Sequence, residues 1–257
     1  MENESLELLR YSHLPELERS PLRQHIVVLS GAGISAESGL STYRDENGLW
    51  KQFDWWGLAS AASFYENPEP VLEFCNMLRK QISEAEPNHA HRILAELEKW
   101  YDVTIVTQNV DDLHERAGST DVIHLHGEMA KVTSSDDRIN PEYVKELALD
   151  VPINVGDKAG DGSQLRPHIV LFGEYVTGFD KVARIVSEAD IFVVIGTSLT
   201  VHPAANLVCY AHPEIPKFII NPGDIVAPDG YEHIKENASI GIETFIDRII
   251  ELSLYDL

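Results

Sequence analysis

The sequence predicts an α/β fold, a Rossmann-like doubly wound parallel sheet with a smaller inserted lobe, on the strength of three observations. Short runs of apolar and β-branched residues alternate with longer amphipathic stretches along the 257 residues. Such alternation indicates parallel strands joined by helices. The first apolar run leads directly into a glycine-rich turn. Two stretches, 41–87 and 127–166, break the alternation, so we expect them to form the smaller lobe.

Six apolar runs are expected to be buried parallel strands because each is continuous rather than alternating. In chain order they are His25–Ser30, Val103–Thr107, Val122–Leu125, His168–Phe172, Ile191–Gly196 and Lys217–Ile220. Five amphipathic stretches are expected to be helices: Pro70–Ser83, His89–Trp100, Asp180–Ala189, Pro203–Ala211 and Ile242–Leu252. We expect one domain over 1–257, with a large lobe from about 20–40, 88–126 and 167–257 and a small lobe from about 41–87 and 127–166.

Composition argues against several classes of protein. The formal net charge of −22 disfavours nucleic-acid binding, which needs clustered Lys and Arg at the phosphates. No apolar run is long enough to cross a bilayer, and the acidic N-terminus lacks the features of a signal peptide. The two cysteines, Cys75 and Cys209, form no CxxC pair, so no disulfide framework is expected. We expect a cytoplasmic protein without nucleic-acid or membrane partners, and the oligomeric state stays open.

The first chemical motif is Gly31-Ala32-Gly33-Ile34-Ser35-Ala36, which follows an apolar strand and fits the pattern GxGxxA. Glycines there let the backbone approach a pyrophosphate, whose oxygens accept N–H bonds at the following helix N-terminus. The alternative is a tight strand-to-helix turn without a ligand. A dehydrogenase would end a second strand in an acidic residue about 20 residues later, whereas this chain continues with the loop GLSTYRDENGLW. We therefore expect a dinucleotide site that suits cleavage of the nucleotide better than hydride transfer.

Two polar motifs follow at later strand ends. Gln108, Asn109 and Asp111 offer groups suited to ribose hydroxyls and a carboxamide; the alternative is a helix cap with Asp111 as the N-cap. His124 and His126 lie in the run VIHLHG, and the period of a strand places them on one face. Histidine serves as a general base near neutral pH, although a lone histidine is more often a packed residue. The turn at the next residue favours His126 as the base.

The last two motifs are Gly196-Thr197-Ser198, after the run IFVVI, and Asn221, which begins the turn NPGD after KFII. Each of them, taken alone, is more often a simple turn. All five motifs, however, fall at the predicted carboxyl edge of one sheet, where open α/β sheets bind ligands. We therefore expect them to form a single site.

The segments GAGISAESGLSTYRDENGLW, TQNVDDLHERAG, HLHGE, PHIVLFGE and GTSLTVHPA, in this order, resemble the sirtuin family over roughly Ile26 to Asn221. The resemblance implies NAD, consumed as a co-substrate between two lobes, and an acyl-lysine-bearing protein as the second substrate. It implies cofactor contacts from Gly31, Ala32, Gly33, Ser35, Tyr43, Arg44, Gln108, Asn109, Asp111, Gly196, Thr197, Ser198 and Asn221. It further implies catalytic roles for His126, Asn109 and Asp111, and peptide pairing along a strand that contains Val170, Phe172, Gly173 and Glu174.

The resemblance also implies a reaction. The acyl amide oxygen attacks C1′ of the nicotinamide ribose and expels nicotinamide, and His126 then accepts a proton from a ribose hydroxyl that attacks the acyl carbon. The products are free lysine and O-acyl-ADP-ribose, and only a neutral imidazole can accept that proton. One alternative is an NAD glycohydrolase or mono-ADP-ribosyltransferase that uses the same cleft. A second is a non-catalytic sensor of NAD or ADP-ribose, although binding alone requires no base.

The chain departs from the family in its metal ligands. Members commonly carry two CxxC pairs that bind structural zinc between the His-Gly step and the next strand. Residues 127–166 contain neither Cys nor His, and carboxylates alone do not make a tetrahedral zinc site. We therefore expect no zinc and no other metal.

A second departure concerns the acyl group and the cofactor loop. Members that favour succinyl or malonyl groups resemble one another in a Tyr-x-x-Arg pair, where this chain has Cys75 and Leu78. Arg79 lies one residue further, about 100° around the helix, so we expect an uncharged acyl group. Ser41 and Tyr43 replace the usual Pro and Phe, and the added hydroxyl could alter the partition between deacylation and ADP-ribosyl transfer.

Overall fold

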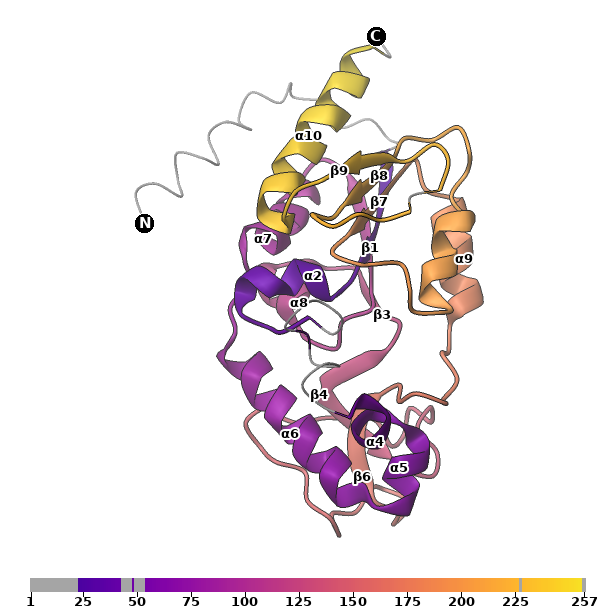
Figure 1. The fold of residues 1–257 in the computed structure, drawn as a ribbon. Helices are drawn as coiled ribbons and strands as arrows, with labels where there is room; N and C mark the ends of the chain where they lie inside the picture. The colour runs from indigo at the N-terminus through magenta and orange to yellow at the C-terminus, as the bar shows by residue number, and fades with distance from the viewer. Residues whose placement is uncertain (1–22, 43–47, 49–53, 227, 256–257) are drawn as a thin grey trace.

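The structure is a computed structural model that describes residues 23–42, 48, 54–226 and 228–255 (Figure 1). Its large sheet is entirely parallel, with the strand order β3-β2-β1-β7-β8-β9. The strands are β1 (His25–Ser30), β2 (Asp102–Thr107), β3 (Val122–His124), β7 (Ile191–Ile195), β8 (Lys217–Ile220) and β9 (Glu232–Ile234). The chain winds outward from β1 in one direction and then from β7 in the other, which confirms the doubly wound sheet and places its switch point between β1 and β7.

Helices cover both faces of this sheet because alternate residues of each strand point to opposite sides. Ile26 and Val28 of β1 pack beneath α7 (His89–Leu97) and α10 (Ala238–Tyr255). Val27 and Leu29 pack on the other side, toward α9 (Phe179–Ser187) and the 3₁₀ helix η3 (Ala204–Cys209). Figure 1 shows α7 and α10 on one side of the strands and α9 on the opposite side. Continuous apolar strands are thus buried from both faces, as the sequence predicts.

Short helices join these strands at the carboxyl edge of the sheet. Helix α2 (Ala32–Ser35) and the 3₁₀ helix η2 (Ala36–Ser38) follow β1, and α8 (Leu113–Ala117) follows β2. The two segments end at left-handed glycines, Gly39 and Gly118 respectively, in a conformation that glycine adopts without steric cost. The chain can therefore reverse sharply above each strand end, which leaves room for a ligand.

A second, three-stranded antiparallel sheet has the order β5-β4-β6, from β4 (Gly127–Ser134), β5 (Lys145–Glu146) and β6 (Leu165–Ile169). Helices α4 (Trp55–Ala59), α5 (Ala61–Glu66) and α6 (Pro68–Glu84) lie against it in the lower half of Figure 1. Leu72, Phe74 and Cys75 of α6 share a buried core with Met129 and Ile169. Helix α6 begins where the Asn67 side chain accepts the N–H of Glu69, with proline in the first turn, a favoured helix start.

Two polar clusters brace this smaller sheet. Arg79, fully buried on α6, donates to the carbonyl oxygens of Met129, Leu147, Ala148 and Val151. Ser134 contacts Asp161 and Ser163, with 2.9 Å between the two serine oxygens. A guanidinium in a fixed fork satisfies several main-chain acceptors at once. The Arg79 contacts tie α6 to β4 and to the long connection between β4 and β6, and the Ser134 contacts tie that connection to β4.

Two predicted elements are wrong. His168–Phe172 is not a parallel strand, because residues 165–169 form β6, antiparallel to β4, in the smaller sheet. A continuous apolar run reports burial on both sides but not the strand direction. Pro203–Ala211 is not an α-helix but contains the 3₁₀ helix η3, with N–H bonds to the third preceding carbonyl, such as Asn206 to Pro203 at 2.9 Å. Short connecting segments commonly adopt this tighter geometry, and an apolar periodicity does not distinguish it from an α-helix.

Strands β4, β5 and β9 were not expected from the sequence, because polar residues interrupt their apolar positions. Among the described helices, none combines the length and apolar character needed to span a bilayer.

Candidate active site

A cleft of about 930 Å³ opens at the carboxyl ends of the large-sheet strands, facing the smaller sheet. It is lined by these sequence-predicted residues: Gly31, Ala32, Gly33, Gln108, Asn109, His126, Val170, Phe172, Gly173, Glu174, Gly196, Thr197, Ser198 and Asn221. Ser35 and Asp111 instead line a small adjoining cavity of about 40 Å³, which shares Ala32 and Asn109 with the cleft. Tyr43 and Arg44 lie outside the described residues. The five motifs therefore meet at one place, at the switch point of the sheet.

The floor of the cleft is a close contact between two glycine turns. The N–H of Gly33 donates to the carbonyl of Gly196 at 2.7 Å. A Cβ on Gly33 would lie 2.7 Å from the Gly196 Cα, and one on Gly196, which has φ of +67°, would lie 2.2 Å from the nitrogen of Ile34. Only glycine permits both the approach and the left-handed backbone. The N–H of Gly33 thus holds the two turns together and is engaged before any ligand binds.

Amide side chains link the strand ends around this floor. Gln108 Nε2 donates to Thr197 Oγ1 at 3.1 Å, and Asn221 Nδ2 donates to the Thr197 carbonyl at 3.3 Å. Asn109, which is buried, donates to the Gly31 carbonyl at 3.3 Å and to Ser35 Oγ at 3.2 Å. The ends of β1, β2, β7 and β8 are consequently held in one polar network, a preorganised surface for a polar ligand.

Asp111 is buried in the small adjoining cavity. Its carboxylate accepts from Ser35 Oγ at 3.1 Å and from the N–H of Leu113 at 3.2 Å. Burial raises the pKa of Asp111 to about 6, against the opposing effect of these two hydrogen bonds. The N-cap of α8 is Asp112, whose side chain makes no capping bond. The alternative that Asp111 is the N-cap is therefore wrong by one residue. Its carboxylate nevertheless accepts the N–H of Leu113, the first residue of α8.

His126 presents a neutral ring to the cleft. Its Nδ1 lies 2.9 Å from the Gln108 carbonyl oxygen, and a carbonyl can only accept, so Nδ1 carries the proton and Nε2 keeps a lone pair. Burial lowers the pKa of His126 below the usual 6.5, although the bond to Gln108 opposes this. The imidazole is therefore neutral at pH 7, and its Nε2 is able to accept a proton.

His124 does not line the cleft. Strand β3 ends at His124, and residues 125–126 form a turn, so the strand period does not relate the two rings. The expectation that they share one face is wrong for this reason. Nδ1 of His124 contacts the Asn109 carbonyl at 3.0 Å, and its Nε2 contacts Glu115 at 2.8 Å. The choice of His126 over His124 as the residue facing a ligand agrees with the cleft.

The segment Val170–Glu174 lines the cleft but is not a strand, which corrects the expectation. The Phe172 N–H donates to the Ala59 carbonyl at 2.8 Å, and the Phe172 carbonyl accepts from Ala61 at 3.0 Å. Gly173 has φ of +93°, and Glu174 folds back to accept the N–H of Leu171 at 2.7 Å. Sequence patterning could not foresee that helices α4 and α5 would take the main-chain groups of Phe172.

Apolar residues of the smaller lobe form the other end of the cleft: Leu58, Phe74, Cys75, Leu78, Met129, Ile169 and Leu171. Only Cys75 and Leu78 were considered from the sequence. Their signal was the alignment with the Tyr-x-x-Arg pair of succinyl- or malonyl-preferring members, and helical spacing of three residues places both side chains on one face of α6. Met129 and Ile169 come from strands β4 and β6, whose pairing the sequence did not reveal.

The two titratable groups predict an acid limit to any reaction that uses them. Protonated His126 has no lone pair, and protonated Asp111 loses acceptor capacity for hydroxyl groups. Both groups become protonated as the pH falls through their pKa values, which are about 6 for Asp111 and below 6.5 for His126. We expect kcat/KM for the nucleotide to fall below about pH 6 with a slope approaching two logarithmic units per pH unit. An Asp111→Asn variant should reduce that slope to about one; an unchanged slope would show that Asp111 does not titrate in catalysis.

Comparisons with known proteins agree with this geometry. The Sir2 family model matches residues 31–203. A relative from Bacteroides thetaiotaomicron, named NAD-dependent protein deacylase, is 48% identical over 223 residues, which cover 86% of this chain and 95% of that protein. A mutant Sir2 homologue solved with ADP ribose superposes with a TM-score of 0.81 at 34% identity, covering 91% of this chain and 94% of the other.

A further solved Sir2 structure contains a deacetylated p53 peptide and 3′-O-acetyl ADP ribose. It superposes with a TM-score of 0.73 at 29% identity, covering 96% of this chain and 97% of the other.

Proposed function

Because this chain belongs to the Sir2 family and is an NAD-dependent protein deacylase, we propose that its cleft transfers an uncharged acyl group from a protein lysine to ADP-ribose, with His126 as the base. The observation that carries this proposal is the neutral, half-buried ring of His126 beside the Gln108–Asp111 segment. A binding module has no need of a base there, so the position argues for chemistry. NAD is consumed in the reaction, which releases nicotinamide and O-acyl-ADP-ribose.

The residues present fit NAD along the floor of the cleft. The floor that would bind the dinucleotide is lined by Gly31, Ala32, Gly33, Gly196, Thr197, Ser198 and Asn221. The close contact between the two glycine turns supports this floor. Gln108, Asn109 and Asp111 supply amide and carboxylate partners for the nicotinamide ribose and carboxamide. Ser35, proposed beside the pyrophosphate, holds Asn109 and Asp111 through its hydroxyl. Tyr43 and Arg44, outside the described residues, remain proposed contacts of the cofactor loop.

In this proposal His126 accepts a proton from a ribose hydroxyl at Nε2 while its Nδ1–H stays bonded to Gln108. That bond fixes the ring orientation and the tautomer. Asn109 and Asp111 orient the ribose from one side. The apolar wall of Phe74, Leu78 and its neighbours limits water at the reacting carbon. Val170, Phe172, Gly173 and Glu174 would border the peptide that carries the lysine.

We propose an uncharged acyl group on electrostatic grounds. Among the described residues that line the cleft there is no Lys or Arg, whereas Glu37, Glu174 and Asp224 are present. Arg166 is bidentate to Glu174 at 2.5 and 3.1 Å, and Arg79 is engaged by main-chain carbonyls. Burial raises the pKa of the Cys75 thiol to about 12, although the charges of Arg166 and Arg79 oppose this rise. The thiol is therefore uncharged, and the apolar end of the cleft contains no thiolate. A carboxylate placed there would lack a partner.

A panel of acyl peptides tests this proposal. Acetyl- and butyryl-lysine peptides should turn over about a hundredfold faster than the succinyl peptide, because an unpaired buried carboxylate is costly. Leu78→Arg, alone and with Cys75→Tyr, should raise succinyl turnover and lower acetyl turnover, and Lys80→Arg on the exposed face of α6 should change neither. Faster succinyl turnover by the unaltered protein would contradict the proposal.

We propose that the protein needs no structural zinc. The contacts of Arg79 and of Ser134 with Asp161 and Ser163 support this, because they brace the connection between β4 and β6. Elemental analysis should find zinc well below one atom per chain, and a chelator should leave Tm unchanged within about 1 °C, since loss of a structural zinc unfolds its lobe. Stoichiometric zinc that a chelator removes with a fall in Tm would contradict this.

We divide the chain into a large lobe and a small lobe of about 41–87 and 127–166, supported by the core that α6 shares with β4 and β6.

We place the enzyme in the cytoplasm, which the unpaired Cys75 and Cys209 support. Its protein partner carries the acyl-lysine, and neither nucleic acid nor a membrane is required.

A further inference from the structure

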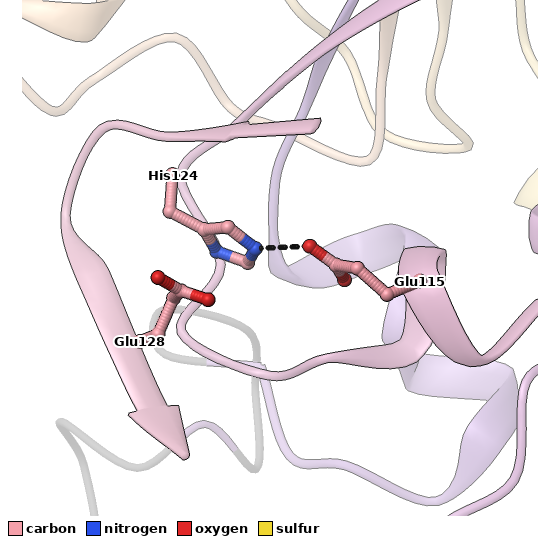
Figure 2. Close-up of side chains that lie close together, drawn as sticks. All are labelled: Glu115, His124 and Glu128. Carbon is pink, nitrogen blue, oxygen red and sulfur yellow. Dashed lines mark hydrogen bonds and ion pairs between the residues drawn. The ribbon is translucent and has the colours of Figure 1, made fainter. Parts of the chain in front are cut away.

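His124 lies two residues before His126 and has no part in the mechanism proposed above. Only 6% of its side chain is exposed, and both ring nitrogens have partners. Nδ1 lies 3.0 Å from the carbonyl oxygen of Asn109, and Nε2 lies 2.8 Å from Oε1 of Glu115 on α8. Figure 2 shows Glu115 meeting the ring end-on while Glu128, at the start of β4, approaches it from another side. Because a carbonyl only accepts, Nδ1 donates a proton to Asn109.

The surroundings of His124 favour a charged ring. Burial alone lowers its pKa, but the hydrogen bond and charge of Glu115, the charge of Glu128 and the Asn109 carbonyl together raise it. The other charged groups nearby are Lys131, which pairs with Glu128 at 2.6 Å, and Asp111, whose pKa the charge of His124 lowers. His114 on α8 is also close, and the charge of His124 contributes to its lowered pKa. His124 is therefore more readily protonated than a free imidazole, and it is bonded to the main chain of the segment that carries Asn109 and Asp111.

The two histidines hold neighbouring carbonyls in the same way. Nδ1 of His126 donates to the carbonyl of Gln108, and Nδ1 of His124 donates to the carbonyl of Asn109. Their Nε2 atoms have different surroundings. The ring of His126 lines the cleft, whereas Nε2 of His124 is bonded to Glu115. One ring therefore has a nitrogen for catalysis, and the other is fully committed to holding its neighbours.

We propose that the Glu115–His124 pair is a positioning device that fixes the Asn109 carbonyl and thereby sets the affinity of the site for NAD rather than the rate of acyl transfer. This rests on the proposed function only in taking Asn109 and Asp111 as NAD contacts. Asn109 reaches across to Gly31 and Ser35, so displacement of its main chain would disturb the floor of the cleft. A positively charged ring also stabilises the ionised form of Asp111.

Glu115, His124 and Glu128 together also have the chemistry of a divalent-metal site, with ligand atoms within 4.8 Å of one another. The contacts present favour a protonated ring instead. His124 and Glu115 are hydrogen-bonded to each other, and Glu128 pairs with Lys131. Metal binding would have to displace the proton on Nε2 and break this pair, so it is an outcome for the experiment to exclude.

Three variants test the inference by calorimetric Kd for NAD and ADP-ribose, together with KM and kcat for deacylation. His124→Ala should raise Kd and KM for NAD about tenfold, the value of one hydrogen bond to a charged group, with kcat within about twofold. His124→Asn should restore most of the affinity, because its amide nitrogen occupies the position of Nδ1 and can donate to Asn109. Glu115→Gln keeps an acceptor for Nε2 but removes the charge, so its effect should be intermediate.

His89→Ala is the matched control. His89 forms a similar pair with Glu243, between α7 and α10, and does not line the cleft. It should leave Kd, KM and kcat unchanged. His126→Ala provides the opposite comparison, with kcat lost and ADP-ribose affinity retained.

The inference is overturned if His124→Ala lowers kcat at unchanged Kd, or if the folded His124→Asn protein binds as weakly as His124→Ala. It is also overturned by stoichiometric Zn²⁺ or Co²⁺ binding that His124→Asn and Glu128→Gln abolish, which would make the cluster a metal site. Failure of the proposed function gives a separate result. In that case the unaltered protein binds ADP-ribose without forming O-acyl-ADP-ribose, and the affinities still decide the role of His124.

Discussion

Replacing His126 with alanine will lower kcat for acyl transfer roughly a thousandfold while ADP-ribose still binds. The ring is half-buried, its Nδ1–H is bonded to the Gln108 carbonyl, and partial burial lowers its pKa. It is therefore neutral and oriented before substrate arrives. Among the described residues that line the cleft, no other histidine is held by the Gln108 carbonyl. The loss should appear in kcat because the base acts only in the transition state.

Single-turnover measurements with saturating NAD and acetyl-lysine peptide check this expectation. His212→Ala is the control, since His212 is exposed and does not line the cleft. Calorimetry with ADP-ribose shows whether the His126→Ala site is intact. A variant that binds ADP-ribose and retains kcat within tenfold of the unaltered protein would remove His126 from the role of base.

Gly196→Ala will lower the free energy of unfolding by about 4 kcal/mol and abolish NAD binding. The backbone at Gly196 has φ of +67°, which costs about 1–2 kcal/mol for any residue with a Cβ. The new methyl group would also meet the nitrogen of Ile34 at 2.2 Å and the carbonyl carbon of Gly33 at 2.7 Å, which are main-chain atoms that cannot rotate away. The two glycine turns would separate, and the floor of the cleft would open.

Denaturant unfolding and calorimetry with NAD measure the two effects. Gly178→Ala is the matched control, because Gly178 has φ of +77° but nothing lies within 4 Å of its Cβ position. It should lose only the backbone contribution of about 1–2 kcal/mol and keep full NAD affinity. Equal losses in the two variants would show that the contact between the turns has no energetic importance.

The parts of the site that could be predicted are the polar and glycine residues that come directly after a strand. Gly31, Gln108, Gly196 and Asn221 each come immediately after a continuous apolar run, and parallel strands bring their carboxyl ends to one edge. Their convergence therefore needed only the fold class. The choice of His126 depended on its position at a turn, and the cleft agrees with it.

Other features depended on contacts between distant segments. The closeness of Gly33 to Gly196 arises because β1 and β7 are neighbours, which no local pattern records. Ser35 turns away from the cleft because Asp111 and Asn109 bind its hydroxyl. The direction of β6 and the loss of strand geometry after Ile169 follow from pairing with β4 and from the contact of Phe172 with α4 and α5. Periodicity reports burial, and it does not report which partner provides it.

The most direct test of the central claim is the ratio of nicotinamide released to O-acyl-ADP-ribose formed, followed by mass spectrometry with NAD and an acetyl-lysine peptide. The account predicts one O-acyl-ADP-ribose for each nicotinamide, no release of nicotinamide without the acylated peptide, and loss of O-acyl-ADP-ribose in His126→Ala. Nicotinamide released without acylated peptide and without O-acyl-ADP-ribose would contradict the claim and identify the cleft as that of a glycohydrolase or ADP-ribosyltransferase.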